Sequence, residues 1–484
     1  MWLRDLFARI PEAARPREVG ATGRPLSTRL AEPSASFRTV PERFVQDIWY
    51  GLLFDTSRVH TTDGVAVRII DTGTPNTDGG PDFLGARLVI DGIEWNGDVE
   101  IHVRSSDWIA HRHQDDPVYD RVILHVALVA DIWTGRLERP DNTPLPEVIL
   151  LPFLGQPVRR LFRALRVRSA ADPIACAGQL RRVPPDLVAG WSERLGFERM
   201  RERKGVLAQN LAAAGGIEAL LYHAVFEALG YSKNGGPMLD LARRVPLALL
   251  RQHTQSGREA LLLGGSGLLE VPLDNERDPR PTYVNELRDY FGTVPTSAIV
   301  PMRQVVWTWF RLRPSNFPTL RIAQGAALFE TGSILGSGGI EAIDVALRGD
   351  GLPALRRLVR VAPGPFWSGH LRLDRPTAQR SAALGVDRAD RIIVNAILPV
   401  ALLHAEQTGN TSLIQHVYRI YGQLPAEQDE RVGIFASRGI EPENMIQSQG
   451  LHQLYRSRCR TAGCLSCVIG RYLLSDHSIR PDAG

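Results

Sequence analysis

The sequence predicts an α/β domain followed by a large, mostly α-helical region. Between residues 65 and 129, four short runs are rich in β-branched residues and bounded by Gly, Asp or Pro, as strands usually are. After about residue 152, long stretches carry Ala, Leu and Arg with helical periodicity. A chain of 484 residues is long for one hydrophobic core, so two or three domains are expected.

The order of elements gives the predicted domain limits. A short amphipathic helix is expected after Pro41, from the spacing of Phe44, Val45, Ile48, Trp49, Leu52 and Leu53. Strands are expected over Val65–Ile70, Gly85–Ile90, Ile93–Val103 and Arg121–Val129. Helices are expected over Leu187–Ala213, Ile217–Leu229, Met238–Gln252, Arg321–Leu335 and Arg388–His404. We therefore predict a flexible arm over residues 1–38, the α/β domain over 39–155 and the mostly helical region over 156–484.

Composition and charge bound the location and the partners. The hydrophobic share of 44% and charged share of 23% are ordinary for a globular protein. No segment approaches the roughly 20 apolar residues that span a bilayer, and the start lacks the pattern of a secretory signal. We therefore expect a cytoplasmic protein with no membrane partner. The net charge of +4 is compatible with a polyanion such as nucleic acid but does not by itself indicate one.

Two carboxylates and an imidazole form the first candidate site. Side chains of a strand alternate between its faces, so Glu100 and His102 share one face while Val99, Ile101 and Val103 take the other. Asp91-Gly92 is a strong hairpin signal, and a two-residue turn there places Asp82 opposite residue 101, or opposite Glu100 or His102 if the register shifts by one. Converging carboxylates repel unless a cation lies between them. Oxygen ligands favour Mg²⁺, and the imidazole shifts the preference toward Mn²⁺.

A second polar group follows on the chain: Asp107, His111, His113, Asp116, Tyr119 and, on the next predicted strand, His125. The spacing His111-x-His113-x-x-Asp116 is compatible with a transition-metal site. The alternative, which we favour, is a hydrogen-bonded rim that supports the first site or contacts phosphate. His111, His113, Asp116 and His125 are then supporting residues around His102.

The four cysteines indicate a second metal site. Cys459, Cys464 and Cys467 lie close together near the C-terminus, and Cys176 is the chain's other cysteine. Three thiolates on one loop and a distant fourth suit a [4Fe–4S] cluster or, alternatively, structural Zn²⁺. Unligated thiols are the third possibility. A site of this kind would tie the end of the chain to the α/β domain.

The N-terminal part resembles the PD-(D/E)xK nuclease superfamily. The resemblance rests on Pro81-Asp82, the hairpin, and Glu100-x-His102 in place of an acid, any residue and lysine, with a helix before and a strand after. It implies a mixed sheet, one or two Mg²⁺ ions on Asp82 and Glu100, and an assisting Glu42 on the opening helix. Some nucleases of this superfamily also hold a cluster with one distant and three C-terminal cysteines. The departure from the pattern is His102, which lacks a permanent charge.

Three functions therefore compete. The first is a metal-dependent nuclease, acting on DNA or, as the less favoured alternative, on RNA, with Asp82, Glu100, His102 and Glu42 as catalytic residues. The second is a non-catalytic nucleic-acid-binding protein on a degenerate nuclease fold. The third is a structural or redox iron–sulfur protein. Each predicts a different combination of cleavage, binding and redox signal.

The chain also resembles a bacterial family known as domain of unknown function 2851. The resemblance covers nearly all of it from about residue 40 and rests on six stretches: Glu42–Trp49, Asn76–Phe83, Gly97–Trp108, His111–Val126, Leu312–Arg321 and Gln449–Gly470. It implies no established activity. The function is therefore inferred from the residues themselves.

Overall fold

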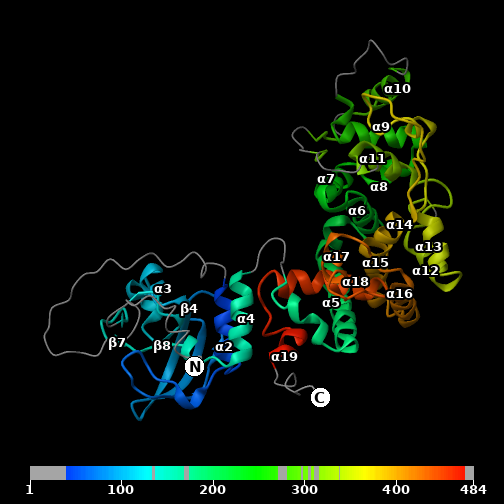
Figure 1. Ribbon diagram of the computed structural model, residues 1–484. Helices are drawn as coiled ribbons and strands as arrows, with labels where there is room; N and C mark the ends of the chain where they lie inside the picture. The colour runs from blue at the N-terminus through cyan, green and yellow to red at the C-terminus, as the bar shows by residue number, and fades with distance from the viewer. Residues whose placement is uncertain are drawn as a thin grey trace, which may run out of the picture. The chain divides into compact units, whose positions relative to one another are not determined.

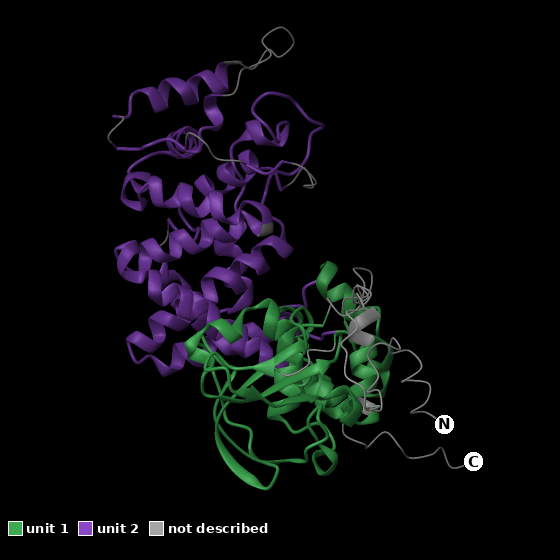
Figure 2. Cartoon of the chain, turned by 90° about the vertical axis from the view of Figure 1, so that its left-hand side faces the viewer, with its two compact units in different colours: residues 1–192, 429–441, 451–484 green, residues 193–428, 442–450 purple. Residues whose placement is uncertain are grey.

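The computed structural model describes residues 40–132, 137–167, 174–270, 281–295, 298–302, 307–309, 316–336 and 338–474 (Figure 1). The predicted arm over residues 1–38 lies outside the described residues. The chain divides into two compact units, coloured separately in Figure 2. Unit 1 comprises residues 1–192, 429–441 and 451–484, and unit 2 comprises residues 193–428 and 442–450.

Unit 1 is built on a mixed sheet, which confirms the predicted α/β part. Its strand order is β1-β3-β4-β5-β8, with β2 paired to the start of β3. β1, β3 and β4 are antiparallel neighbours, whereas β4, β5 and β8 run parallel. The bounds are β1 (Val67–Asp71), β2 (Thr74–Pro75), β3 (Phe83–Ile90), β4 (Ile93–Arg104), β5 (Val122–Val129) and β8 (Glu147–Ile149).

The β3–β4 hairpin fixes where Asp82 lies. Asp91 and Gly92 form the two-residue turn and both have positive φ, 53° and 77°, as a type I′ turn requires. From Ile90↔Ile93 to Ala86↔Gly97 the paired positions keep the predicted register. A bulge then shifts the pairing by one residue, so that Phe83 pairs with Val99. Asp82, just before β3, therefore lies beside Glu100.

Helix α2 (Glu42–Tyr50) and α4 (Gln156–Val167) pack on this sheet (Figure 1). The side of α2 that carries Phe44, Val45, Ile48 and Trp49 is buried, and the ring of Phe44 stacks on that of Phe162 in α4. Every residue of β5 is buried, as expected for a parallel strand inside a sheet. Helix α2 ends at Tyr50, three residues before the predicted apolar series does.

The C-terminal part of the chain contributes to the same core. Ala462, Cys464 and Leu465 belong to the hydrophobic cluster that contains the β4 and β5 side chains. Helix α19 (Val468–Leu474) contacts α4 and the 3₁₀ helix η7 (Ala177–Arg182). The remaining elements of unit 1 are η3 (Thr56–Arg58), α3 (Asp107–Ala110), η4 (His113–Asp115), η5 (Pro117–Tyr119), β6 (Leu137–Glu138), β7 (Pro144–Leu145), η6 (Leu151–Phe153), α17 (Glu430–Ala436) and the π-helical η12 (Tyr455–Cys459).

Unit 2 is helical, which confirms the predicted texture of this region. Its core joins Leu221, Phe226, Leu262, Ile393 and Leu402, all fully buried, in one cluster. Its elements are most of α5 (Pro185–Ala214), α6 (Ile217–Leu229), α7 (Tyr231–Arg244), α8 (Leu247–Arg251), α9 (Gln255–Gly265), η8 (Leu268–Glu270), α10 (Pro281–Gly292), α11 (Pro318–Ala327), α12 (Ile340–Arg348), α13 (Leu352–Val359), η10 (Pro365–Ser368), α14 (Val386–Ile392), the π-helical η11 (Ile393–Ile397), α15 (Leu398–Gln407), α16 (Thr411–Gln423) and the first part of α18 (Met445–Leu454).

None of the helices within the described ranges has the length and apolar character needed to cross a membrane.

Candidate metal centre

Asp82 and Glu100 are locked together at the bulged end of the β3–β4 hairpin. The backbone N–H of Asp82 donates to Glu100 Oε2 at 3.1 Å, and the N–H of Ile101 donates to Asp82 Oδ2 at 3.0 Å. Gln46, one turn after Glu42 on α2, donates from Nε2 to Asp82 Oδ1 at 2.8 Å. Both carboxylates are thereby held in one orientation. Glu100 Oε1 points to the histidines described next.

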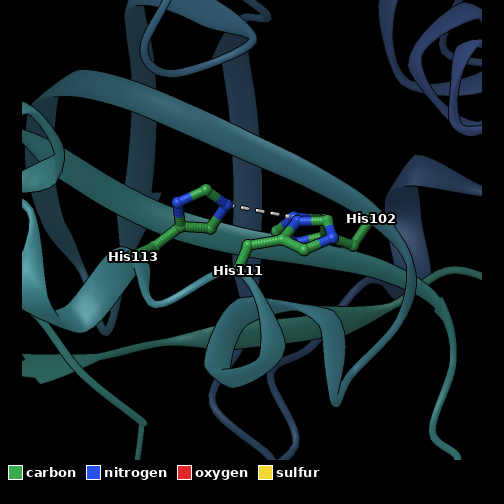
Figure 3. A group of neighbouring side chains, drawn as sticks. All are labelled: His102, His111 and His113. Carbon is green, nitrogen blue, oxygen red and sulfur yellow. Dashed lines mark hydrogen bonds between the residues drawn. The ribbon is translucent and has the colours of Figure 1, made fainter.

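Three imidazoles meet beside Glu100. His102 Nε2 lies 3.1 Å from His111 Nδ1 and 3.3 Å from His113 Nε2, and these nitrogens lie within 4.8 Å of one another (Figure 3). Glu100 Oε1 is 3.5 Å from His102 Nε2 and 3.3 Å from His113 Nε2. Glu42 Oε1 is 3.8 Å from His102 Nε2. His102 and His113 are buried, whereas His111 is exposed, so the group opens to solvent on the His111 side.

The segment after β4 is folded so that His111 and His113 turn back over the strand. Asp107, at the start of α3, accepts hydrogen bonds from the backbone N–H and the guanidinium of Arg104. Trp108 is fully buried and its ring contacts those of His113 and His125. Arg112 has a left-handed backbone, φ 60°, which reverses the chain between the two histidines. The loop is therefore a fixed part of the site.

A buried chain of contacts, from Glu147 through His125, determines which ring nitrogen of His102 carries the proton. Glu147 Oε1 lies 3.0 Å from His125 Nδ1, and His125 Nε2 lies 2.9 Å from His102 Nδ1. An ionised carboxylate only accepts, so a neutral His125 carries its proton on Nδ1 and accepts at Nε2. His102 must then carry its proton on Nδ1. Its Nε2 keeps a lone pair, and that nitrogen faces His111, His113 and Glu100.

Burial and the closeness of other titratable groups shift the pKa values of these residues toward their neutral forms. Desolvation, followed by the neighbouring carboxylates, raises the pKa of Glu42 to about 8. Desolvation also raises the pKa of Glu100, and desolvation with the charge of Glu100 raises the pKa of Asp82. Desolvation and then the other histidines lower the pKa of His102 to about 2. Among the described residues, no lysine or arginine pairs with these three carboxylates; their salt-bridge partners are histidines.

The donor set fits a divalent cation. The buried Glu100 and the partly buried Asp82 have no lysine or arginine partner among the described residues, so a cation between them would be favoured, and His102 offers a lone pair close to Glu100. His113, oriented by Trp108 and Tyr119, supplies a second buried imidazole. Mixed carboxylate and imidazole ligands suit Mn²⁺ or another first-row metal better than Mg²⁺, which prefers oxygen.

Some of the predicted site residues come together around His102, and others lie farther out and support them. Asp82, Glu100, His102, His111 and His113 come together, with Glu42 at the edge and His125 behind His102. Asp116 accepts from the N–H of Val118 at the start of η5 and acts on His113 only through its charge. The arrangement of His111 and His113 around His102 Nε2 favours the ligand alternative over the rim.

Two residues of the site were not predicted. Glu147 lies on the three-residue strand β8, opposite His125 in the parallel register, and that register brings Glu100, His125 and Glu147 into one row across three strands. Nothing in the sequence around Glu147 signals this pairing. Gln46 had a signal: it lies four residues after Glu42, on the same side of the predicted helix.

The cysteine region lies in unit 1. Cys464 and Cys467 are buried, and Cys176 and Cys459 are partly exposed. Cys467 immediately precedes α19, and its sulfur accepts from the N–H groups of Ile469 and Gly470 and from the side chain of Trp191. Helix α19 contacts η7, which begins directly after Cys176. The segments that carry Cys176 and Cys467 are therefore neighbours, but no three of the four thiols, all of them in described residues, lie close enough together to hold an ion.

A family model described as "Protein of unknown function (DUF2851)" matches residues 42–430. The chain belongs to the DUF2851 family. No curated protein and no solved structure matches it. The match begins at Glu42, the first residue of α2, and includes every residue of the candidate metal centre in this DUF2851 chain, which confirms the family resemblance read from the sequence. Cys459, Cys464 and Cys467 follow the matched range.

In this DUF2851 chain, Glu147→Gln is expected to weaken Mn²⁺ binding about 10- to 100-fold, because the carboxylate behind a ligating histidine raises the basicity of that ligand. Isothermal titration calorimetry with Mn²⁺ measures the effect. Glu138→Gln, on the exposed side of β6, is the matched control and should bind as the wild type does. If both variants bound Mn²⁺ with the same affinity, Glu147 would have no role in metal binding.

Proposed function

We propose that this protein is a metal-dependent nuclease that hydrolyses phosphodiester bonds of DNA. One observation carries the proposal: Asp82 and Glu100 meet at a hairpin bulge beside the lone-pair nitrogen of His102, in a buried group without a basic partner. Such a group must hold either protons or a cation, and its exposed His111 side gives a substrate access. A divalent ion bound there supplies Lewis acidity toward a phosphodiester.

The order of elements supports assignment to the PD-(D/E)xK superfamily. Helix α2 precedes three antiparallel strands, and a crossover containing α3 leads to β5, parallel to β4. Asp82 precedes the middle strand of the three, and Glu100 and His102 lie on the third, which are the places of the two acids and the lysine in the superfamily's pattern. Glu42 occupies the position of the helical glutamate.

We assign a role to each residue from its exposure and its protonation. Asp82, Glu100, His102, His111 and His113 would hold the cation. His102 is a poor general base because its pKa is low and both ring nitrogens already have partners. Glu42 is 42% exposed and 3.8 Å from His102; a cation held beside it would lower its raised pKa and leave it as the carboxylate that can accept a proton from an attacking water.

The experiment is a cleavage assay on the full chain. Single- and double-stranded DNA and RNA are incubated with Mn²⁺, with Mg²⁺ and with EDTA. We expect cleavage of DNA with Mn²⁺ and none with EDTA. Binding that weakens with salt but no cleavage under any divalent ion would instead identify a nucleic-acid-binding platform. Neither binding nor cleavage would reject a nucleic-acid function.

We further propose that Cys176, Cys459, Cys464 and Cys467 hold a [4Fe–4S] cluster that ties the C-terminal segment to unit 1. The support is the contact of α19 with η7 and the N–H groups donated to the Cys467 sulfur, since such donors stabilise a ligating thiolate. Anaerobic purification should give broad visible absorption and about four irons per chain. Cys467→Ser should lose both, whereas zinc without iron in the wild type would make the site a structural zinc site.

A further inference from the structure

Two arginines of unit 2 lie side by side without a carboxylate between them. Arg321, in the first turns of α11, and Arg388, in α14, both donate to the same side-chain oxygen, Asn316 Oδ1, at 2.7 and 2.9 Å. Arg321 is only 6% exposed. Two guanidinium groups that share one acceptor are close enough to repel strongly in a buried setting.

Among the residues that the structure describes, the side chain of Arg321 donates only to neutral amides. Besides Asn316 it donates to Gln324 Oε1 at 2.6 Å, and its Nε is buried with no acceptor within the described part of the chain. Burial, and then the charge of Arg388, lowers the pKa of Arg321 to about 9. A buried cation with neutral partners and an unused N–H is costly unless an anion completes it.

Arg388 is a second arginine whose N–H donors are not all satisfied among the described residues. Its Nη1 is also buried without an acceptor among the described residues, and its guanidinium lies 4.6 Å from the centre of the Tyr231 ring. Arg391 lies 4.9 Å from the same ring and acts on Arg388 as a like charge. Glu427 is the acid near the group, and it pairs with Arg391 at 3.5 Å. Within the described residues, Glu427 therefore acts on Arg388 and Arg391, and no carboxylate acts on Arg321.

The helix geometry favours negative charge at this place. Helix α11 starts at Pro318 with no side-chain cap and no acid in its first turn, so the positive end of its dipole is not neutralised by its own residues. Arg321 lies one turn from that end. Tyr231 is 38% exposed, so the arginine pair is reachable from solvent at the Tyr231 side.

We infer that Arg321, Arg388 and Asn316 form a binding site for a phosphate group in unit 2. Guanidinium groups donate through planar forks that match phosphate oxygens, and the two unused N–H donors, Arg321 Nε and Arg388 Nη1, are the ones that a phosphate would take. A tetrahedral dianion neutralises two cations at once, which a single carboxylate does not. The site is independent of the metal centre, which lies in unit 1.

The test uses the full chain and inorganic phosphate. Calorimetric titration at constant ionic strength should show saturable binding by the wild type, weakened at least about tenfold in Arg388→Gln. Arg388→Lys, which keeps the charge and loses the fork, should fall between them. Arg201→Gln, an exposed arginine of α5, should bind as the wild type does.

Thermal unfolding provides the second measurement. In phosphate-free chloride buffer, Arg388→Gln should melt at or above the wild-type temperature, because repulsion with Arg321 is relieved; phosphate should raise only the wild-type temperature. Equal stabilisation of wild type and Arg388→Gln by phosphate, or no saturable binding by the wild type, would overturn the inference. Titration with a nucleoside monophosphate and a short DNA strand then distinguishes a free phosphate from one carried on a nucleotide or a nucleic acid.

Discussion

Replacing Glu100 with glutamine is expected to lower the rate of Mn²⁺-dependent DNA cleavage by about 10³-fold or more. Glu100 Oε1 is the oxygen that faces His102 and His113, and Glu100 Oε2 accepts the N–H of Asp82. Glutamine keeps the size and can keep the hydrogen bond, but it removes the charge that draws a cation. Because the Asp82 contact survives, the loss should appear in metal binding and cleavage and not in folding.

The same substitution elsewhere on β4 is the control. Glu94 lies on the same strand but is exposed, so Glu94→Gln should retain wild-type cleavage and Mn²⁺ affinity. Circular dichroism should be the same for both variants. If Glu100→Gln cleaved DNA at the wild-type rate, or if the activity remained in EDTA, the carboxylate pair would not be the site of hydrolysis, and contaminating nuclease would have to be excluded first.

The hairpin shows how far sequence reasoning reaches at this site. Asp91-Gly92 predicted the turn, and alternation predicted that Glu100 and His102 share one side of β4. The turn fixes the register near it, but the bulge before Ala86 decides which residue Asp82 meets. A bulge depends on how both strands pack against their neighbours, so local sequence offered only the three alternatives of residue 100, 101 or 102.

Longer-range features were not predictable in the same way. Glu147 reaches His125 because β8 pairs in parallel with β5, and a three-residue strand gives almost no periodic signal. His111 and His113 were expected to surround the site, and the left-handed Arg112 between them is what brings both rings to His102. Such a conformation is rare for arginine and depends on the surrounding contacts.

The helices were predicted well where periodicity was continuous and less well near proline. The prediction over Leu187–Ala213 agrees with α5, Pro185–Ala214. The prediction over Met238–Gln252 was wrong about continuity, since α7 ends at Arg244 and α8 starts after Pro246, which fixes an extended backbone at that point. Pro237, by contrast, lies inside α7, so proline position alone does not settle where a helix ends.

The metal-free protein is expected to lose stability as pH rises from 6.5 to 8.5, because the acids of the metal centre must ionise in the folded state. His102 has a pKa of about 2 in the folded state against 6.5 unfolded, so below pH 6.5 the unfolded chain binds more protons and stability falls as pH falls. Glu100 has a folded pKa of about 8 against 4.5, so it holds a proton in the folded state and its contribution is lost as pH rises toward 8. Between pH 4.5 and 6.5 the effects of His102 and Glu100 cancel; above pH 6.5 only the acids act, and Glu42 and Asp82, whose pKa values are also raised, add to the loss.

Thermal unfolding in EDTA from pH 5 to 9 measures this profile. Between pH 6.5 and 8.5 Glu100 should account for a loss on the order of 2 kcal/mol in the wild type, with further loss from Glu42 and Asp82; Glu100→Gln, which resembles the protonated acid, should lose less by about that amount and exceed the wild type at pH 8.5. Saturating Mn²⁺ should reverse the wild-type trend, because the ion competes with protons for the same oxygens and nitrogens and binds more tightly as pH rises. If both proteins lost the same stability above pH 6.5, Glu100 would not be the titrating group. A loss that Mn²⁺ leaves unchanged would mean that the buried acids do not bind the ion, and the nuclease proposal depends on their doing so.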